Sequence, residues 1–234
     1  ELNLQRNSID NPLYTRKGSQ FMFSVAATPP WSLWDGKDYK NMSDQDEAKF
    51  RMIEYHKWKF KAKIFSPLAP LTVKRTPVLM TRVEYGFLGS YNKYKKSPFE
   101  TFYMGGDGMS GYSSTYATET IGLRGYENGS IAGNGGYNSY GYAYSRLSME
   151  LRYPFLLEPS STIYGLVFVE AGNAWRDLKD FNPFQLKRSA GVGVRIFLPM
   201  IGLMGIDWAY GFDRPDGYDQ RGGSNFHFII GQEF

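Results

Sequence analysis

The sequence of 234 residues contains no cysteine and only two histidines, His56 and His227. Without cysteine the chain cannot form disulfides, thiolate metal sites or cysteine nucleophiles. Neither histidine belongs to a His-Glu-x-x-His frame, and we interpret both as ordinary strand residues. The glycines at 105–108 precede no Gly-Lys-Ser/Thr phosphate loop, and the glycines around Ser110 lack the spacing of a nucleophile elbow. The sequence therefore predicts no enzyme, no cofactor and no bound metal.

Long hydrophobic runs are also missing. The mean hydropathy is −0.43, and no stretch approaches the ~18 apolar residues that a membrane helix requires. Aromatic residues, in contrast, make up 17% of the chain, and there are 26 glycines. This combination favours strands and irregular loops over helices, and it is expected of membrane barrels with aromatic girdles.

The charges are nearly balanced, with 27 basic and 23 acidic residues and a net charge of +4. The lysines do not form a patch that would indicate nucleic acid. Instead, Lys59, Lys61 and Lys63 alternate with apolar residues, which places them on one face of a strand. Asp213, Asp216 and Asp219 do not have the spacing of a known calcium loop, and we interpret them as solvated loop residues. The charge pattern thus predicts a strand with one wet and one apolar face.

Alternation with a period of two residues predicts about nine strands. In most of them one face is apolar or aromatic, and the other carries glycine, serine and charged residues. A soluble barrel would have the reverse polarity, with the apolar residues inside. We therefore predict an all-β fold, an antiparallel transmembrane β-barrel of the outer-membrane type. The predicted strands span 1–7, 19–28, 49–65, 77–91, 142–155, 162–174, 188–198, 203–212 and 225–234.

The connections between these strands alternate in length. Short turns alternate with long polar loops near 29–48, 92–141, 175–187 and 213–224, as in outer-membrane barrels with short periplasmic turns and long outer loops. An odd number of strands cannot close such a barrel, and the chain begins within a strand-like segment. We therefore expect residues 1–234 to be the C-terminal part of a barrel domain whose N-terminal strands are absent from this chain.

One loop motif, Leu123-Arg124-Gly125-Tyr126, carries a charge that requires a partner. Two later strands each place a single glutamate among apolar residues, Glu150 and Glu170, and alternation points both inward. Asp207 points inward by the same rule. A buried carboxylate is unfavourable unless it is paired, so we expect the loop to fold into the lumen and to bring Arg124 to these acids. The alternative is an ordinary exposed loop arginine.

The C-terminal segment alternates aromatic and polar residues and ends on Phe234. From the alternation alone, it is the last lipid-facing strand. Its outward residues are predicted to be Phe226, Phe228, Ile230 and Phe234.

Together these features resemble the BamA family, the outer-membrane barrels of the barrel assembly machinery. The resemblance rests on segments 10–19, 102–106, 121–126, 168–175 and 188–195. This chain departs from the family in its Gly/Tyr-rich segment 104–120, in Tyr126 where Phe is common and in Glu170 where Asp is more usual.

The resemblance implies a barrel of about sixteen strands, preceded by periplasmic POTRA domains that this chain lacks. It implies insertion and folding of barrel proteins in the bacterial outer membrane through a lateral seam, without nucleotide hydrolysis. The partners would be nascent outer-membrane barrels, accessory lipoproteins and outer-membrane lipid, with no nucleic acid. A terminal strand ending in an aromatic residue resembles the signal by which such barrels are themselves assembled, and it would form one side of the seam.

Three other functions remain open at this stage. A related translocator, of the two-partner secretion or autotransporter assembly type, would share the arginine loop. A passive porin or adhesin would make the grouping of Arg124, Glu150 and Glu170 accidental. An outer-membrane hydrolase is disfavoured because the sequence offers no credible Ser–His pair.

Overall fold

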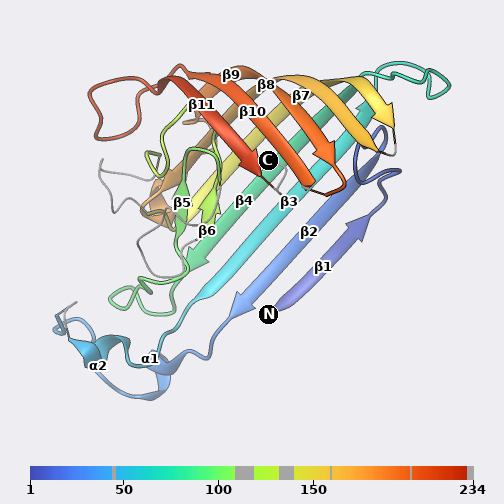
Figure 1. The fold of residues 1–234 in the computed structure, drawn as a ribbon. Helices are drawn as coiled ribbons and strands as arrows, with labels where there is room; N and C mark the ends of the chain where they lie inside the picture. Colours follow the sequence, from blue (N-terminus) through green and yellow to red (C-terminus); the bar gives the residue numbers. More distant parts are fainter. Residues whose placement is uncertain (44–45, 109–118, 132–139, 159, 201, 231–234) are drawn as a thin grey trace.

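The computed structural model describes residues 1–43, 46–108, 119–131, 140–158, 160–200 and 202–230. In this part of the chain one antiparallel sheet of nine strands dominates, in the order β1-β2-β3-β4-β7-β8-β9-β10-β11 (Figure 1). The strands are β1 (Leu2–Asn7), β2 (Gly18–Ala27), β3 (His56–Pro67), β4 (Val78–Gly89), β7 (Ala143–Glu158), β8 (Ser161–Trp175), β9 (Lys187–Leu198), β10 (Gly202–Gly211) and β11 (Gly223–Ile230). Strands that follow one another in the sheet also follow one another in sequence, apart from β5 and β6. The predicted antiparallel fold is confirmed.

The alternation along each strand separates an apolar outer face from a polar inner face. On β8, the side chains of Val167 and Val169 are 56% and 53% exposed, whereas Phe168 and Glu170 beside them are buried. Several aromatic residues predicted to face lipid are exposed: Trp58, Trp208, Tyr210, Phe226 and Phe228. So much exposed apolar surface is unfavourable in water and suits the hydrocarbon of a bilayer.

The long connection from β4 to β7 returns to the concave side of the sheet, where it forms β5 (Phe102–Met104) and β6 (Glu119–Ile121), a parallel pair (Figure 1). Glu119 meets the inner face of β3, with its carboxylate 3.2 Å from the Nζ of Lys57 and 3.1 Å from that of Lys59. Burial opposes the charge on Glu119, but the lysines outweigh it and hold its pKa below the ordinary value. The inward lysines therefore bind this returning connection.

The third predicted strand began too early. It was expected from residue 49, but β3 begins at His56, because a short helix, α2 (Glu47–Phe50), precedes it. The Asp46 side chain caps α2 by accepting a hydrogen bond from the backbone of Ala48. The sequence also did not predict α1 (Trp31–Trp34), β5, β6 or the 3-10 turn η1 (Leu178–Asp180). Among the described residues, no helix is long and apolar enough to cross a membrane.

Candidate functional site: the arginine loop in the lumen

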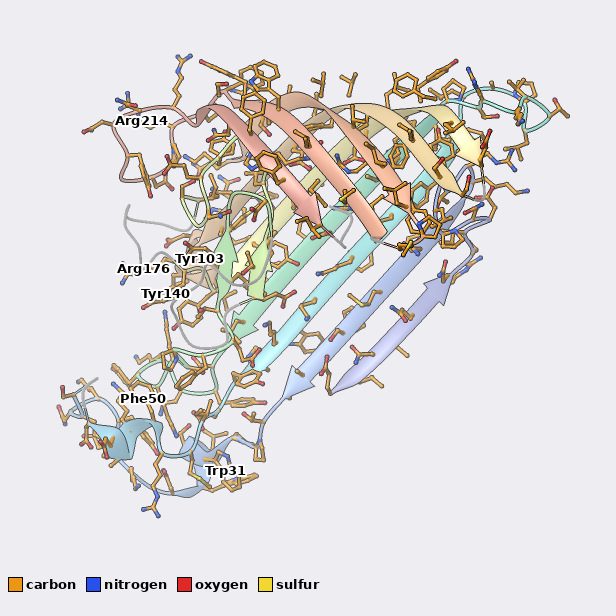
Figure 2. The ribbon with its side chains drawn as sticks, in the orientation of Figure 1. Trp31, Phe50, Tyr103, Tyr140, Arg176 and Arg214 are labelled. Carbon is orange, nitrogen blue, oxygen red and sulfur yellow. The ribbon has the colours of Figure 1, made fainter. Side chains whose placement is uncertain are left out.

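The segment 119–131, hereafter the lumen loop, is fixed inside the barrel by backbone bonds and by apolar packing. The backbone of Leu123 donates to the carbonyl of Gly106. Leu123 and Tyr126 are fully buried in a cluster that includes Phe102 from β5 and Tyr144 from β7 of the wall. Figure 2 shows the loop and its side chains on the concave side of the strands. This apolar support positions Arg124 without leaving it free to sample solvent.

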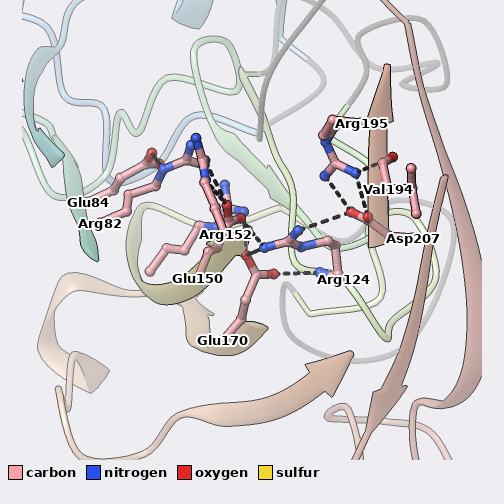
Figure 3. Close-up of polar contacts among 10 residues, drawn as sticks. Arg82, Glu84, Arg124, Glu150, Arg152, Glu170, Val194, Arg195 and Asp207 are labelled. Atoms are coloured by element: carbon pink, nitrogen blue, oxygen red, sulfur yellow. Dashed lines mark hydrogen bonds and ion pairs between the residues drawn. The ribbon is translucent and has the colours of Figure 1, made fainter. Parts of the chain in front are cut away.

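Arg124 lies at the centre of three carboxylates. Its Nη2 is 2.6 Å from Oε1 of Glu150 and 2.7 Å from Oε1 of Glu170, and its Nη1 is 3.0 Å from Oδ2 of Asp207 (Figure 3). Its backbone N–H donates to Oε2 of Glu170 at 2.9 Å. The three acids, which we call the carboxylate trio, stand on β7, β8 and β10. One loop side chain thus ties together three strands of the wall.

The guanidinium also stacks on an aromatic ring, with its central carbon 3.4 Å from the centroid of Phe168. The Arg124 side chain is 0% exposed. Burial disfavours its charge, but Glu170, Glu150 and Asp207 outweigh this effect, so the pKa of Arg124 lies above its ordinary value. Arg124 is therefore a permanent cation in a buried site, where charge pairs are stronger than at a surface.

Each acid of the trio also binds a second arginine from the wall. The shortest distances are 2.8 Å for Arg146 to Glu170, 2.7 Å for Arg152 to Glu150 and 2.6 Å for Arg195 to Asp207. We did not identify these arginines from the sequence. For two of them the sequence does indicate the contact. Arg146 and Arg152 lie at even offsets from Glu150 on the same strand, so all three side chains must point to the same face.

Gly125 and Tyr126 continue the contact toward the last strands. Gly125 has a φ of 87°, which glycine adopts without strain, and its N–H donates to Nε2 of His227 at 2.9 Å. The hydroxyl of Tyr126 donates to the carbonyl of Arg188 at 2.7 Å. Burial raises the pKa of Tyr126 to about 12, so the hydroxyl keeps its proton. All four residues of the predicted loop motif are thus buried in contact with the wall.

Comparison with known proteins shows the family of the chain. The Omp85 superfamily domain matches residues 1–234. The chain belongs to the Omp85 superfamily. This membership, with the barrel-type fold, places the Omp85 chain in the bacterial outer membrane. None of the curated protein sequences compared with the chain matches it.

Among solved structures, the fold is similar to BamA from Haemophilus ducreyi in a crystal structure that lacks POTRA domains 1–3, with a TM-score of 0.65 and 19% sequence identity. The match covers 97% of this chain and 41% of that one. At this identity the likeness shows the fold, and this Omp85 chain spans less than half of the compared protein.

His227 of this Omp85 barrel corrects one interpretation. We interpreted it as an ordinary strand residue, but it is buried, lies opposite Asp207 in the pairing of β10 with β11 and accepts the bond from Gly125. Its inward direction agrees with the prediction from alternation, because Phe226 and Phe228 on either side face outward. Its partner could not be predicted, because 102 residues separate Gly125 from His227.

The terminal strand β11 presents Phe226, Phe228 and Ile230 outward, with exposed fractions of 66%, 58% and 65%. Phe234 lies outside the described residues. Within the described part of the chain, β11 pairs with β10 alone. Its other edge is the place where the predicted seam would lie.

The outer-loop aspartates bind basic side chains of β9. Asp213 accepts from Arg188 at 2.9 Å, and Asp216 accepts from Lys187 at 2.8 Å. The hydrogen bond from Arg188 holds the pKa of Asp213 below its ordinary value. No group of acids or histidines among the described residues could hold a metal ion.

Proposed function

We propose that this Omp85 chain is the C-terminal part of the barrel of a BamA-type insertase, which folds and inserts β-barrel proteins into the outer membrane. Clients would enter through a lateral seam beside β11, without nucleotide hydrolysis. Its partners would be nascent outer-membrane barrels, accessory lipoproteins and membrane lipid. The observation that carries the proposal is the buried contact of Arg124 with the carboxylate trio, which joins the lumen loop to one side of the barrel.

The location of this contact argues for a fixed wall beside a movable edge. Arg124 connects β7, β8 and β10, so the strands that lead up to β11 gain a second set of links through the lumen. A passive pore gains little from a loop that occupies its lumen so firmly. A protein that must open at one edge, in contrast, needs the remaining strands to stay together while it does so.

The chemistry at that edge needs no nucleotide. Inside a bilayer, each unpaired backbone N–H or C=O is strongly unfavourable. A client strand that pairs with an exposed edge satisfies these groups on both chains, as in other cases of strand addition. Pairing itself therefore supplies a driving force for insertion.

Two cysteine variants test the proposal in the full-length protein. Phe226→Cys on β11 and Val192→Cys on β9 are matched, because both residues face outward and flank Trp208 in the sheet register. The described chain has no cysteine of its own. During assembly of a client with one cysteine in its terminal strand, we expect disulfide trapping at position 226 and not at 192.

Equal trapping at the two positions, or none at either while assembly proceeds, would reject the seam and favour a passive barrel. Trapping of an unfolded secreted segment in place of a barrel strand would favour the translocator instead.

A further inference from the structure

The lumen loop reaches beyond the carboxylate trio to the last strand of the chain. The trio stands on β7, β8 and β10, so its contacts with Arg124 leave β11 untouched. The next residue, Gly125, makes that connection with its N–H, which donates to Nε2 of the buried His227 at 2.9 Å. The donor is a neutral backbone N–H, so it needs an acceptor with a lone pair and does not need a charged one. His227 supplies this acceptor from β11.

Two glycines allow the loop backbone to approach this closely. A Cβ at Gly211 would lie 2.3 Å from the carbonyl oxygen of Gly125, and one at Gly222 would lie 2.5 Å from the same atom. Real Cβ contacts are not this short. We call Gly211, which ends β10, and Gly222, which precedes β11, the glycine seat.

The aromatic residue of the motif contacts the same hairpin and the neighbouring strand. Tyr126 donates to the carbonyl of Arg188 on β9, and its hydroxyl accepts from the backbone of Asp213, just after β10. The loop therefore contacts β9, β10 and β11 through its own backbone and through one hydroxyl, in addition to the charges of Arg124.

We propose that His227 and the glycine seat couple the lumen loop to the terminal strand, so that a seated loop holds β11 in register and a displaced loop releases it. This inference rests on the proposed function, because it makes β11 the strand that clients meet. His227 is a positioning residue here, and it acts through the loop backbone. The strand with a partner on one side alone would thereby receive a second restraint from the lumen.

Amide hydrogen exchange of the full-length protein in lipid bilayers measures this coupling without any client. We expect His227→Leu, which removes the acceptor, to speed exchange in residues 223–230 by about tenfold, while β8 and the inner part of β9 keep the exchange of the unmodified protein. His227→Gln is expected to restore slow exchange, because its side-chain oxygen can accept near the position of Nε2. Phe226→Leu, on the outward face of the same strand, is the control and should exchange normally.

Gly222→Ala tests the same coupling without touching His227 or any charge. The added methyl group would push against the Gly125 carbonyl and the Tyr126 ring, and we expect it to reproduce the faster exchange of β11. This variant keeps the test valid if His227→Leu fails to fold.

Equal behaviour of the Leu and Gln variants, or normal exchange of β11 in both His227→Leu and Gly222→Ala, would overturn the coupling. The result is independent of client trapping. Faster exchange of β11 in His227→Leu and Gly222→Ala, without client trapping at position 226, would reject the insertase and retain the coupling. Trapping at position 226, with unchanged exchange in those variants, would retain the insertase and reject the coupling.

Discussion

Two arginine–carboxylate contacts in this barrel have similar distances and opposite surroundings. In the lumen, the Arg124 side chain is 0% exposed and binds three acids. At the outer rim, the Arg188 side chain is 68% exposed and makes two bonds of 3.0 and 2.9 Å to a single acid, Asp213, within the described part of the chain. Solvent replaces the rim contact when it breaks, but it cannot reach the lumen contact. Burial, more than hydrogen-bond length, therefore decides which of the two supports the fold.

The largest expected effect is the loss of Arg124. Arg124→Ala leaves the trio with fewer cations in a buried site, and breaking a buried pair in this way costs about 3–5 kcal/mol. Denaturant unfolding in bilayers, or a lower temperature for loss of the compact band on gels, measures this cost. The stability of Arg124→Lys should lie between that of Arg124→Ala and that of the unmodified protein. An ammonium group keeps the charge but lacks the planar array of donors with which a guanidinium binds three carboxylates.

Arg188→Ala is the control for this measurement, since Arg188 also makes charged hydrogen bonds to a carboxylate, but in solvent. An equal loss of stability in the two alanine variants would show that lumen water screens Arg124. The comparison between the two sites would then fail.

A smaller effect is expected at Phe168. The ring of Phe168 is a feature that distinguishes the lumen site from the rim site, because Arg188 has no such ring among its described contacts. Phe168→Leu keeps most of the volume but removes the ring beneath the guanidinium. A desolvated cation–π contact is worth about 2 kcal/mol, so we expect a loss of about 1–2 kcal/mol in the same unfolding experiment. Phe228→Leu, at an outward ring, should unfold like the unmodified protein, and a similar loss there would assign the effect to general packing.

The nine strands and their faces were predictable because each depends on neighbouring residues alone. Alternation fixes which side chains of β8 point inward, whatever the rest of the barrel does. The inward direction of Glu150 and Glu170 was also predictable, because a lone carboxylate among apolar residues is strongly unfavourable when it faces lipid.

The remaining features depend on contacts between distant segments. Nothing local in the sequence near His227 indicates a partner 102 residues away. The helix α2 was missed because apolar and polar residues also alternate in part of 49–55. The N-cap bond from Ala48 to Asp46 stabilises the helix at its start. The contact of Glu119 with the lysines of β3 likewise needs the return of the loop into the lumen.

The smallest expected effect, and the one that sharpens the comparison most, concerns the response of the two sites to salt and acid. The pKa of Asp213 is lowered by its bond from Arg188, so the rim pair contributes stability at neutral pH, and this contribution is lost as the pH falls through the folded pKa of Asp213, below the ordinary value of about 3.9. Salt should weaken it as well, because exposed pairs are screened within about 10 Å at 0.1 M. Unfolding of Asp213→Asn and the unmodified protein should therefore differ slightly at pH 7 and low salt, and the difference should vanish in 1 M salt. The loss caused by Arg124→Ala should persist in 1 M salt, and its disappearance there would mean that ions reach the lumen site and that both arginines are, in effect, surface residues.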